Sequence, residues 1–456
     1  MSVQIYIKKS AYIPFHSAKR ENDLCTFDFF PTFAAIMTHD SIYTLKNGLR
    51  IIHRQDPSPV VYCGYVIGTG SRHELPGEEG LAHFVEHTTF KGTKRRKAWD
   101  IINGLECVGG ELNAYTNKEN TVYYAALLNE HIGLAIDLLT DIVNASTYPE
   151  KEIGKEKEVV CDEIDSCLDS PPDLIFDEFE NIIFRGHPLG HNILGTENRV
   201  RSFCGADTLR FARKHYRPEN MVFFVSGNVD MKIVVDSLEQ QYARLDTTIP
   251  TIDLPAPPLD HTDSQRKYQL METGEGQYEL LQHTHQTHVM MGCGSYNRHD
   301  DRRMPLFLLN NLLGGPGMNS RLNVSLRERN ALVYTVESYS FNYSDKGTWG
   351  IYFGCDSHDR ERCMQLVRKE LDTLMQQRLT PDELFAAKRQ VKGQLRIAAD
   401  NRENAAIDMG RHLLCYGREK DLDEVCRVID GITASQIQEV AQEIFHPQRL
   451  VSLVIS

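Results

Sequence analysis

A proline-rich stretch near the middle of the chain divides the sequence into two patterned parts of roughly 200 residues each. Residues 245–265 contain Pro250, Pro255, Pro257 and Pro258 among mostly polar neighbours. Proline lacks an amide hydrogen and restricts the residue before it to extended backbone, so this stretch favours an extended linker over a helix. We therefore predict a first domain at residues 41–245, a linker at 246–264 and a second domain at 265–456.

Both parts mix strand-like alternation with helix-like periodicity. Strands are expected at residues 50–54, 60–67, 111–116 and 121–127 of the first part and at 288–294 and 347–354 of the second, and helices at 149–167, 305–313 and 319–329. This mixture predicts an α+β protein of two homologous α/β-sandwich domains. Each would have a largely antiparallel sheet with helices on one face.

The composition excludes two kinds of partner. The 456 residues carry a formal net charge of −13, without the basic excess or basic stripe of a nucleic-acid-binding protein. The short basic cluster at residues 91–97 is interpreted as a solvated loop. No apolar run approaches the roughly 18–20 residues that cross a membrane. We therefore expect neither nucleic acid nor membrane as a partner, and we treat residues 1–40 as an N-terminal extension of unknown role.

Cysteine usage indicates the compartment. Eleven cysteines are scattered singly from Cys25 to Cys426 without a CxxC pair. This spacing argues against a disulfide framework and against a thiolate zinc site. It favours a reducing compartment, and we predict a cytoplasmic location.

The most informative segment is His83-Phe84-Val85-Glu86-His87. On a helix, His83 and His87 share one face four residues apart, so both imidazoles can reach one metal ion. Glu86 lies beside them. HxxEH is the inverted form of the HExxH motif of zinc hydrolases, but a short motif alone is only suggestive. A catalytic zinc also needs a third protein ligand.

The helix expected at residues 149–167 offers candidates for that third ligand. Glu156 and Glu163 are seven residues apart, which leaves them on one helical face two turns from each other. Two acids beside a buried apolar stripe need a cation or a hydrogen-bond network. Seen alone, this helix would more simply be interpreted as having a solvated acidic face.

Together, these two segments resemble the M16 metallopeptidases, a family that includes insulysin, pitrilysin and the mitochondrial processing peptidase. The resemblance extends from about residue 41 to the C-terminus and implies the LuxS/MPP-like metallohydrolase fold. It implies that one zinc ion per chain is bound by His83, His87 and Glu163. Glu86 would be the general base, and Glu156 would support the site.

Two further stretches match the family in substrate-handling residues. Gly109 to Thr116 (GGELNAYT) followed by Thr121 to Tyr123 resembles its GGxxNAxT…TxY stretch, which implies an edge strand where Asn113 and Ala114 bind the substrate backbone. Taken without the zinc motif, this stretch would more simply be interpreted as a plain hairpin. Arg327 and Tyr334, seven residues apart, match the family's Arg/Tyr pair. The resemblance implies that they face the zinc site across a closed chamber and bind the substrate and its polarised carbonyl.

The length of the chain bears on assembly. Members of the family close a chamber from four such domains, and this chain has about two. The resemblance therefore implies two chains, most simply a homodimer, with a heterodimer containing an inactive homologue as the alternative.

We predict a zinc metalloendopeptidase that cleaves peptides or unfolded polypeptides. One alternative is a maturation protease dedicated to one peptide precursor. Another is a non-catalytic assembly subunit similar to the core proteins of the respiratory bc1 complex, which share the fold. Such subunits have usually lost zinc ligands, whereas all three are present here.

Overall fold

The computed structural model describes residues 40–245, 270–282 and 284–456, whose strands form two six-stranded sheets. The predicted linker at 246–264 lies outside these residues, as does the predicted extension at 1–40 except for Asp40. The strands of the first sheet are β1 Ser41–Thr44, β2 Arg50–Gln55, β3 Val60–Ile67, β4 Glu111–Thr116, β5 Thr121–Leu128 and β6 Met221–Gly227. Those of the second are β7 Leu270–Gly274, β8 Gln277–Leu280, β9 Thr287–Ser295, β10 Val333–Asn342, β11 Gly347–Cys355 and β12 Val451–Ile455.

The second sheet repeats the topology of the first. The first has the strand order β1-β2-β6-β3-β5-β4 and the second has β10-β11-β9-β12-β8-β7. Read in reverse, the second order matches the first strand by strand. The parallel pair β2–β6 corresponds to the parallel pair β8–β12, and the other paired strands are antiparallel in both sheets. The predicted pair of homologous, largely antiparallel α/β domains is confirmed.

Helices follow the strands in both halves. In the first half they are α1 Leu81–Thr89, α2 Ala98–Glu106, α3 Ile132–Ala145, α4 Glu150–Leu168, α5 Pro171–Ile183, α6 Glu197–Ser202, α7 Gly205–His215 and α8 Met231–Arg244. In the second they are α9 Arg303–Gly314, α10 Arg360–Gln376, α11 Pro381–Ala399, α12 Arg402–Tyr416, α13 Leu422–Gly431 and α14 Ala434–Ile444. The helix expected at residues 319–329 contains a wider π-helical stretch, Asn323–Glu328.

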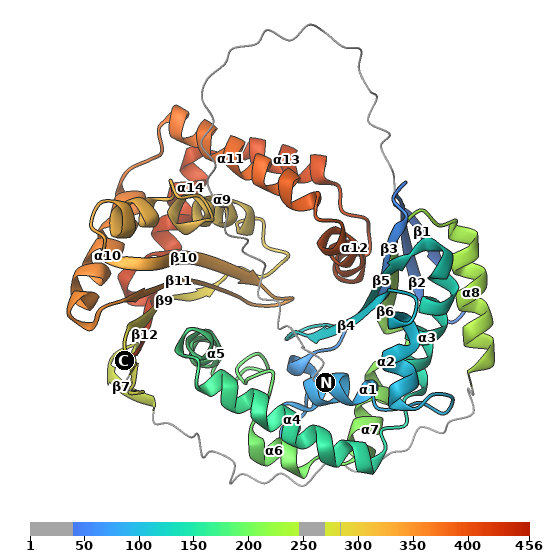
Figure 1. Cartoon of the computed structure of the whole chain (residues 1–456). Helices are drawn as coiled ribbons and strands as arrows, with labels where there is room; N and C mark the ends of the chain where they lie inside the picture. Colours follow the sequence, from blue (N-terminus) through green and yellow to red (C-terminus); the bar gives the residue numbers. More distant parts are fainter. Residues whose placement is uncertain (1–39, 246–269, 283) are drawn as a thin grey trace, which may run out of the picture.

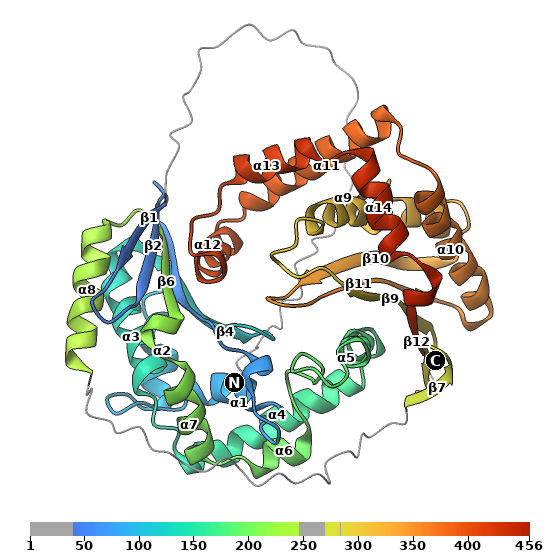
Figure 2. The ribbon, with the colours of Figure 1, turned by 180° about the vertical axis from the view of Figure 1, so that it is seen from behind.

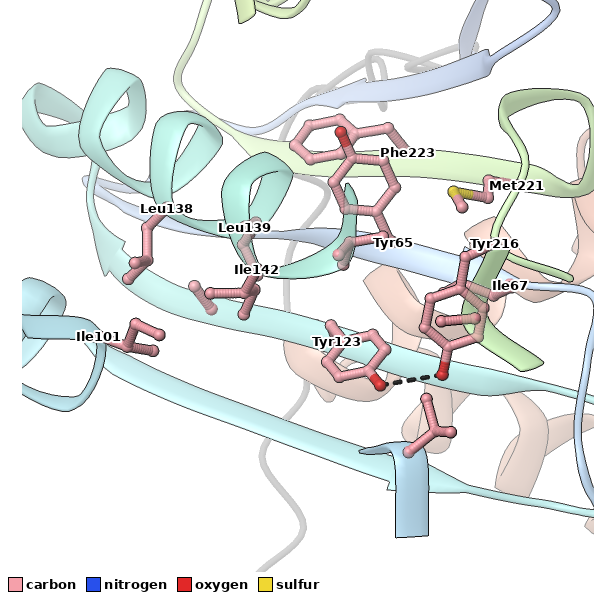
Figure 3. Close-up of a cluster of buried hydrophobic side chains, with 14 of the residues drawn as sticks. Tyr65, Ile67, Ile101, Tyr123, Leu138, Leu139, Ile142, Tyr216, Met221 and Phe223 are labelled. Atoms are coloured by element: carbon pink, nitrogen blue, oxygen red, sulfur yellow. Dashed lines mark hydrogen bonds between the residues drawn. The ribbon is translucent and has the colours of Figure 1, made fainter. Parts of the chain in front are cut away.

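The central strands are buried on both faces. Along β6, Phe223 and Val225 belong to the core under the first half's own helices, whereas Val222 and Phe224 belong to a separate cluster on the opposite face. Successive side chains of a strand point to opposite faces, so two buried faces require a continuous apolar run rather than alternation. Figure 3 shows the first of these cores, where Tyr65 and Phe223 pack together beside α3, the helix of Leu138, Leu139 and Ile142.

The opposite face of each sheet is covered by a helix from the other half of the chain. Helix α12 packs on β2, β3 and β6 of the first sheet, and α5 packs on β9 and β12 of the second (Figures 1 and 2). In the first contact, Ile407 and Met409 meet Val66 and Phe224. This exchange joins the two halves through two apolar cores. It adds a second layer to the one-sided arrangement of helices expected from the sequence.

Removing an aromatic ring from this exchange should destabilise the protein. Phe179 of α5 is fully buried against the second sheet. A Phe179→Ala change leaves a cavity in a close-packed core, so we expect the free energy of unfolding to fall by about 3–5 kcal/mol. Urea unfolding followed by circular dichroism measures this loss. The matched control is Phe385→Ala on α11, where the ring is exposed; equal losses for the two variants would contradict the packing role.

The two halves also meet through ion pairs close to the start of α1. Arg72, just before that helix, binds Asp345 in the β10–β11 turn at 3.0 Å. Glu119 in the β4–β5 turn binds Arg72 and also Arg298 of the second half. The hydrogen bond from Arg72 lowers the pKa of Asp345 to about 2. These contacts fix the β4–β5 hairpin against the second half of the chain.

Among the described residues, no helix combines the length and apolar character that a bilayer crossing requires.

Candidate metal centre

Helix α1 carries the HxxEH motif and begins at a glycine. Gly80 has φ of 95°, a left-handed conformation, and a Cβ there would come within 2.5 Å of the carbonyl oxygen of Leu194. The carboxylate of Glu74 accepts hydrogen bonds from the amides of Gly80 and Ala82, at 3.0 and 2.7 Å. Glu74 therefore caps the positive end of the helix. The sequence analysis did not identify this residue.

Three side chains that the family resemblance assigns to a zinc site lie close together. His83 and His87 come from α1 and Glu163 comes from α4, and their nearest ligand atoms all lie within 4.8 Å of one another. Glu163 Oε2 is 3.3 Å from His87 Nε2 and 3.8 Å from His83 Nε2. Ligands about 2.0–2.2 Å from a tetrahedral zinc ion would be separated by about 3.3–3.6 Å. The donor types and spacing therefore fit zinc.

The second nitrogen of His87 is held by Glu156. His87 Nδ1 lies 3.0 Å from Glu156 Oε1, and Lys91 Nζ lies 2.6 Å from the other carboxylate oxygen. An ionised carboxylate only accepts hydrogen bonds, so Nδ1 carries a proton directed at Glu156, and Nε2 is the nitrogen that can offer a lone pair to a metal ion. His87 Nε2 is buried and has no hydrogen-bond partner among the described residues. It is therefore available to a metal ion.

Burial and neighbouring charges shift the titration of the group. Burial, together with nearby His87, lowers the pKa of His83 to about 3. Burial works against a charged His87, but the hydrogen bond to Glu156 and the nearby carboxylate of Glu163 outweigh it and raise its pKa to about 9, so a metal ion would have to displace the Nε2 proton. Burial would raise the pKa of both glutamates, yet their interactions with His87 lower it. Glu156 and Glu163 therefore remain ionised and place negative charge beside the two imidazoles.

Glu86 lies in the same buried region with one oxygen free. Its side chain is 1% exposed, and Oε2 accepts a hydrogen bond from Thr116 Oγ1 at 3.1 Å. Oε1 has no hydrogen-bond partner within the part of the chain that the structure describes. Burial raises the pKa of Glu86 to about 7. A carboxyl group with such a pKa can both accept and donate a proton near neutral pH.

Asn113 and Ala114 lie on β4, the edge strand of the first sheet next to α1. They pair with Tyr124 and Tyr123 of β5. Ala114 packs against the core that contains α1, whereas its neighbour Tyr115 packs against the cluster of α12. Successive side chains of a strand alternate, so the Asn113 side chain points to the same face as Tyr115 and away from α1. Only the backbone groups of Asn113 at the strand edge can then meet a ligand beside α1.

Arg327 and Tyr334 lie in the second half of the chain, whereas His83, His87 and Glu163 lie in the first. Arg327 is exposed at the end of the π-helical stretch, and its ion pair is with neighbouring Glu328 at 3.7 Å. Tyr334, near the start of β10, is 85% exposed. The hydrogen bonds and ion pairs of the described residues include none that links either residue to His83, His87 or Glu163.

The basic cluster at residues 91–97 is tied to acidic side chains. Besides the Lys91–Glu156 pair, Arg95 and Arg96 both bind Asp141, a buried residue, at 3.0 and 2.6 Å. The interpretation as a solvated loop is therefore wrong for Lys91 and Arg96, whereas Arg95 is exposed as that interpretation predicts. Lys91 pairs with Glu156 beside His87, and the two arginines neutralise a buried carboxylate.

Comparison with known proteins fits this geometry. The family described as insulinase (peptidase family M16) matches residues 50–197, and the M16 inactive domain matches residues 205–391. The uncharacterized zinc protease YmxG of Bacillus subtilis is 33% identical over 413 residues, covering 90% of this chain and 97% of that protein. This chain belongs to peptidase family M16. The uncharacterized zinc protease SCO5738 of Streptomyces coelicolor is 34% identical, over 90% of this chain and 88% of that protein.

Solved structures support the fold. A protease from Helicobacter pylori superposes with a TM-score of 0.80 at 22% identity, covering 92% of this chain and all of the other. An M16 inactive domain from Pseudomonas fluorescens gives 0.77 at 19% identity, covering 91% and 97%. In the second half of this M16 chain, α9 follows β9 as α1 follows β3, but α9 contains no histidine or acid. Helix α9 therefore has no counterpart of the HxxEH motif of α1.

Proposed function

We propose that this M16 chain is a zinc-dependent endopeptidase that hydrolyses peptides or unfolded polypeptides. The observation that carries the proposal is the position of Glu86. A buried carboxylate with one unpartnered oxygen follows His83 by three residues and directly precedes His87 on α1. General-base hydrolysis at a zinc site requires this combination of groups.

His83, His87 and Glu163 would hold one zinc ion per chain. When bound, zinc would polarise the scissile carbonyl and lower the pKa of a water molecule. Glu86 would take the proton of the attacking water on Oε1 and later pass it to the leaving amine. Its raised pKa of about 7 suits both transfers. Glu156 would keep His87 in the tautomer that offers Nε2.

The substrate would add to the edge of β4 as an extended strand. Backbone groups at Asn113 and Ala114 would pair with the peptide, which aligns the scissile bond next to α1. Pairing through the backbone accepts many side chains, which suits a peptidase of broad specificity.

A second copy of the chain would complete the active site within a closed chamber. Arg327 and Tyr334 are exposed in the second half and, among the residues that the structure describes, form no hydrogen bond or ion pair with His83, His87 or Glu163 of their own chain. A homodimer would allow each pair to bind the substrate and its carbonyl in the other subunit. A heterodimer with an inactive homologue is the alternative assembly, and the cytoplasmic location remains a prediction.

A peptide-library experiment tests this function. Purified chain is incubated with a mixed peptide library, with and without a zinc chelator, and the products are identified by mass spectrometry. We expect internal cleavage that stops on chelation and returns with added zinc. Elemental analysis should find about one zinc per chain, as expected for one closed set of ligands, and light scattering should find a dimer. A zinc-loaded dimer without cleavage would favour an assembly subunit instead.

A further inference from the structure

The GGxxNAxT…TxY stretch contains hydroxyl groups that the proposed function leaves unused. Thr116 is the last residue of β4 and Thr121 the first of β5, and the two are paired across the hairpin. Thr116 Oγ1 donates to Glu86 Oε2 at 3.1 Å. Both threonines and Glu86 are buried. A buried hydrogen bond to a charged group is among the stronger interactions within a protein.

Thr121 leaves the Thr116 hydrogen free for Glu86. The Thr121 hydroxyl donates to the carbonyl oxygen of Thr69 at 2.9 Å, so its single hydrogen is already used. Its oxygen lies 3.4 Å from Thr116 Oγ1 and can only accept there. The hydroxyl hydrogen of Thr116 is therefore available to Glu86, whose carboxylate oxygen is its acceptor.

We infer that Thr116 is a positioning residue that fixes Glu86 Oε2 and thereby leaves Oε1 for the attacking water. The inference rests on the proposed function. A carboxylate held at one oxygen loses the rotation that would exchange its two oxygens. Since Glu86 is otherwise bonded to no described side chain, this single contact sets the direction in which Oε1 points.

The same bond joins the base to the edge where the substrate would add. Ala114 and Thr116 stand two residues apart on one face of β4, which corresponds to about 7 Å along a strand. A peptide paired with β4 would take its register from that strand. Thr116 thus fixes the position of Glu86 relative to the strand that aligns the substrate. Misplacement of a catalytic group by 1 Å can lower the rate about 100-fold.

Substitutions at Thr116 test the inference. Valine has the shape of threonine without the hydroxyl, and serine keeps the hydroxyl. For Thr116→Val we expect kcat to fall about 10- to 100-fold while KM changes by less than about 3-fold and zinc content is unchanged. Thr116→Ser should recover most of kcat. A kcat for Thr116→Val within about 2-fold of wild type, or no recovery in Thr116→Ser, would overturn the inference.

A matched control separates positioning from stability. Thr140 on α3 is buried and its hydroxyl bonds Tyr65 at 2.9 Å, far in sequence from the site. Thr140→Val loses one buried threonine hydrogen bond, between two neutral hydroxyls, so it should also lower Tm but keep wild-type kcat. If Thr140→Val lost kcat equally, general stability would explain both and the positioning role would be wrong.

A measurement without zinc tests the contact independently of activity. In zinc-free protein, Thr116→Val should lower Tm in the wild-type background and by less in a Glu86→Ala background, because the acceptor is then absent. Equal shifts would overturn the contact. If zinc-loaded wild type cleaves no peptide, the proposed function itself fails. If wild type cleaves and Thr116→Val is unimpaired, only this inference fails.

Discussion

Replacing Glu86 with glutamine is expected to leave the zinc site intact and to abolish peptide hydrolysis. Glutamine has nearly the same shape, and its amide oxygen can still accept the Thr116 hydroxyl hydrogen. It cannot take a proton from water at neutral pH, so general-base catalysis is lost. We expect kcat to fall by about 10²- to 10⁴-fold. The measurement is kcat on a peptide identified from the library, with zinc content determined on the same preparation.

A matched control for this change is available on the neighbouring helix. Glu106 lies exposed at the end of α2, so Glu106→Gln changes the charge of the chain equally without touching the site. It should keep wild-type kcat. Near wild-type hydrolysis by zinc-replete Glu86→Gln would contradict the assigned role of Glu86, since another group would then be accepting the proton.

The local parts of the fold could be predicted because strand and helix periodicity are local properties. Strand β3 was predicted with its observed bounds, and the helix expected at 149–167 is α4, Glu150–Leu168. Residue spacing also predicted that His83 and His87 share one face of α1, and that Glu156 and Glu163 share one face of α4. The convergence of α1 with α4 followed from the family resemblance rather than from spacing.

The helix exchange could not be predicted from the sequence. The apolar faces of α5 and α12 are typical of any helix that packs on a sheet, and nothing in them specifies which sheet. Glu74 was missed for a related reason. It caps α1 from six residues before Gly80, where no local capping pattern applies, because the chain folds back to bring its carboxylate to the helix end.

The interpretation of residues 91–97 as a solvated loop failed for Lys91 and Arg96 because the partners of these cations come from other helices. Asp141 lies on α3 and Glu156 on α4, about 45 or more residues further along the chain. Charge patterns in a sequence indicate ion pairs within one helix or strand, but they do not reveal pairs between different helices. The acids that pair with Lys91, Arg95 and Arg96 became visible only with the packing of α3 and α4 around them.

Replacing Glu163 with glutamine should remove zinc, whereas replacing Glu156 should only weaken its binding. Glu163 lies 3.3 Å from His87 Nε2 and would contact the ion directly, and a neutral amide is a poor ligand for zinc. Glu156 acts through His87 Nδ1 and Lys91, and loss of such a partner typically costs about 10- to 100-fold in metal affinity. We expect Glu163→Gln to lose more than this range.

Competition with a chromophoric zinc chelator measures both affinities on one scale. The control is Glu158→Gln on the same helix α4, whose side chain is 65% exposed and paired with Arg201. Glu158→Gln should bind zinc as wild type does. Comparison with it corrects the zinc affinities of the other two variants for any loss of helix stability that a Glu→Gln change in α4 causes. An order in which Glu156→Gln loses more zinc than Glu163→Gln would exchange the two roles, because the group that contacts the ion must contribute more than the group that orients its ligand. Equal affinities for Glu163→Gln and Glu158→Gln would remove Glu163 from the metal site.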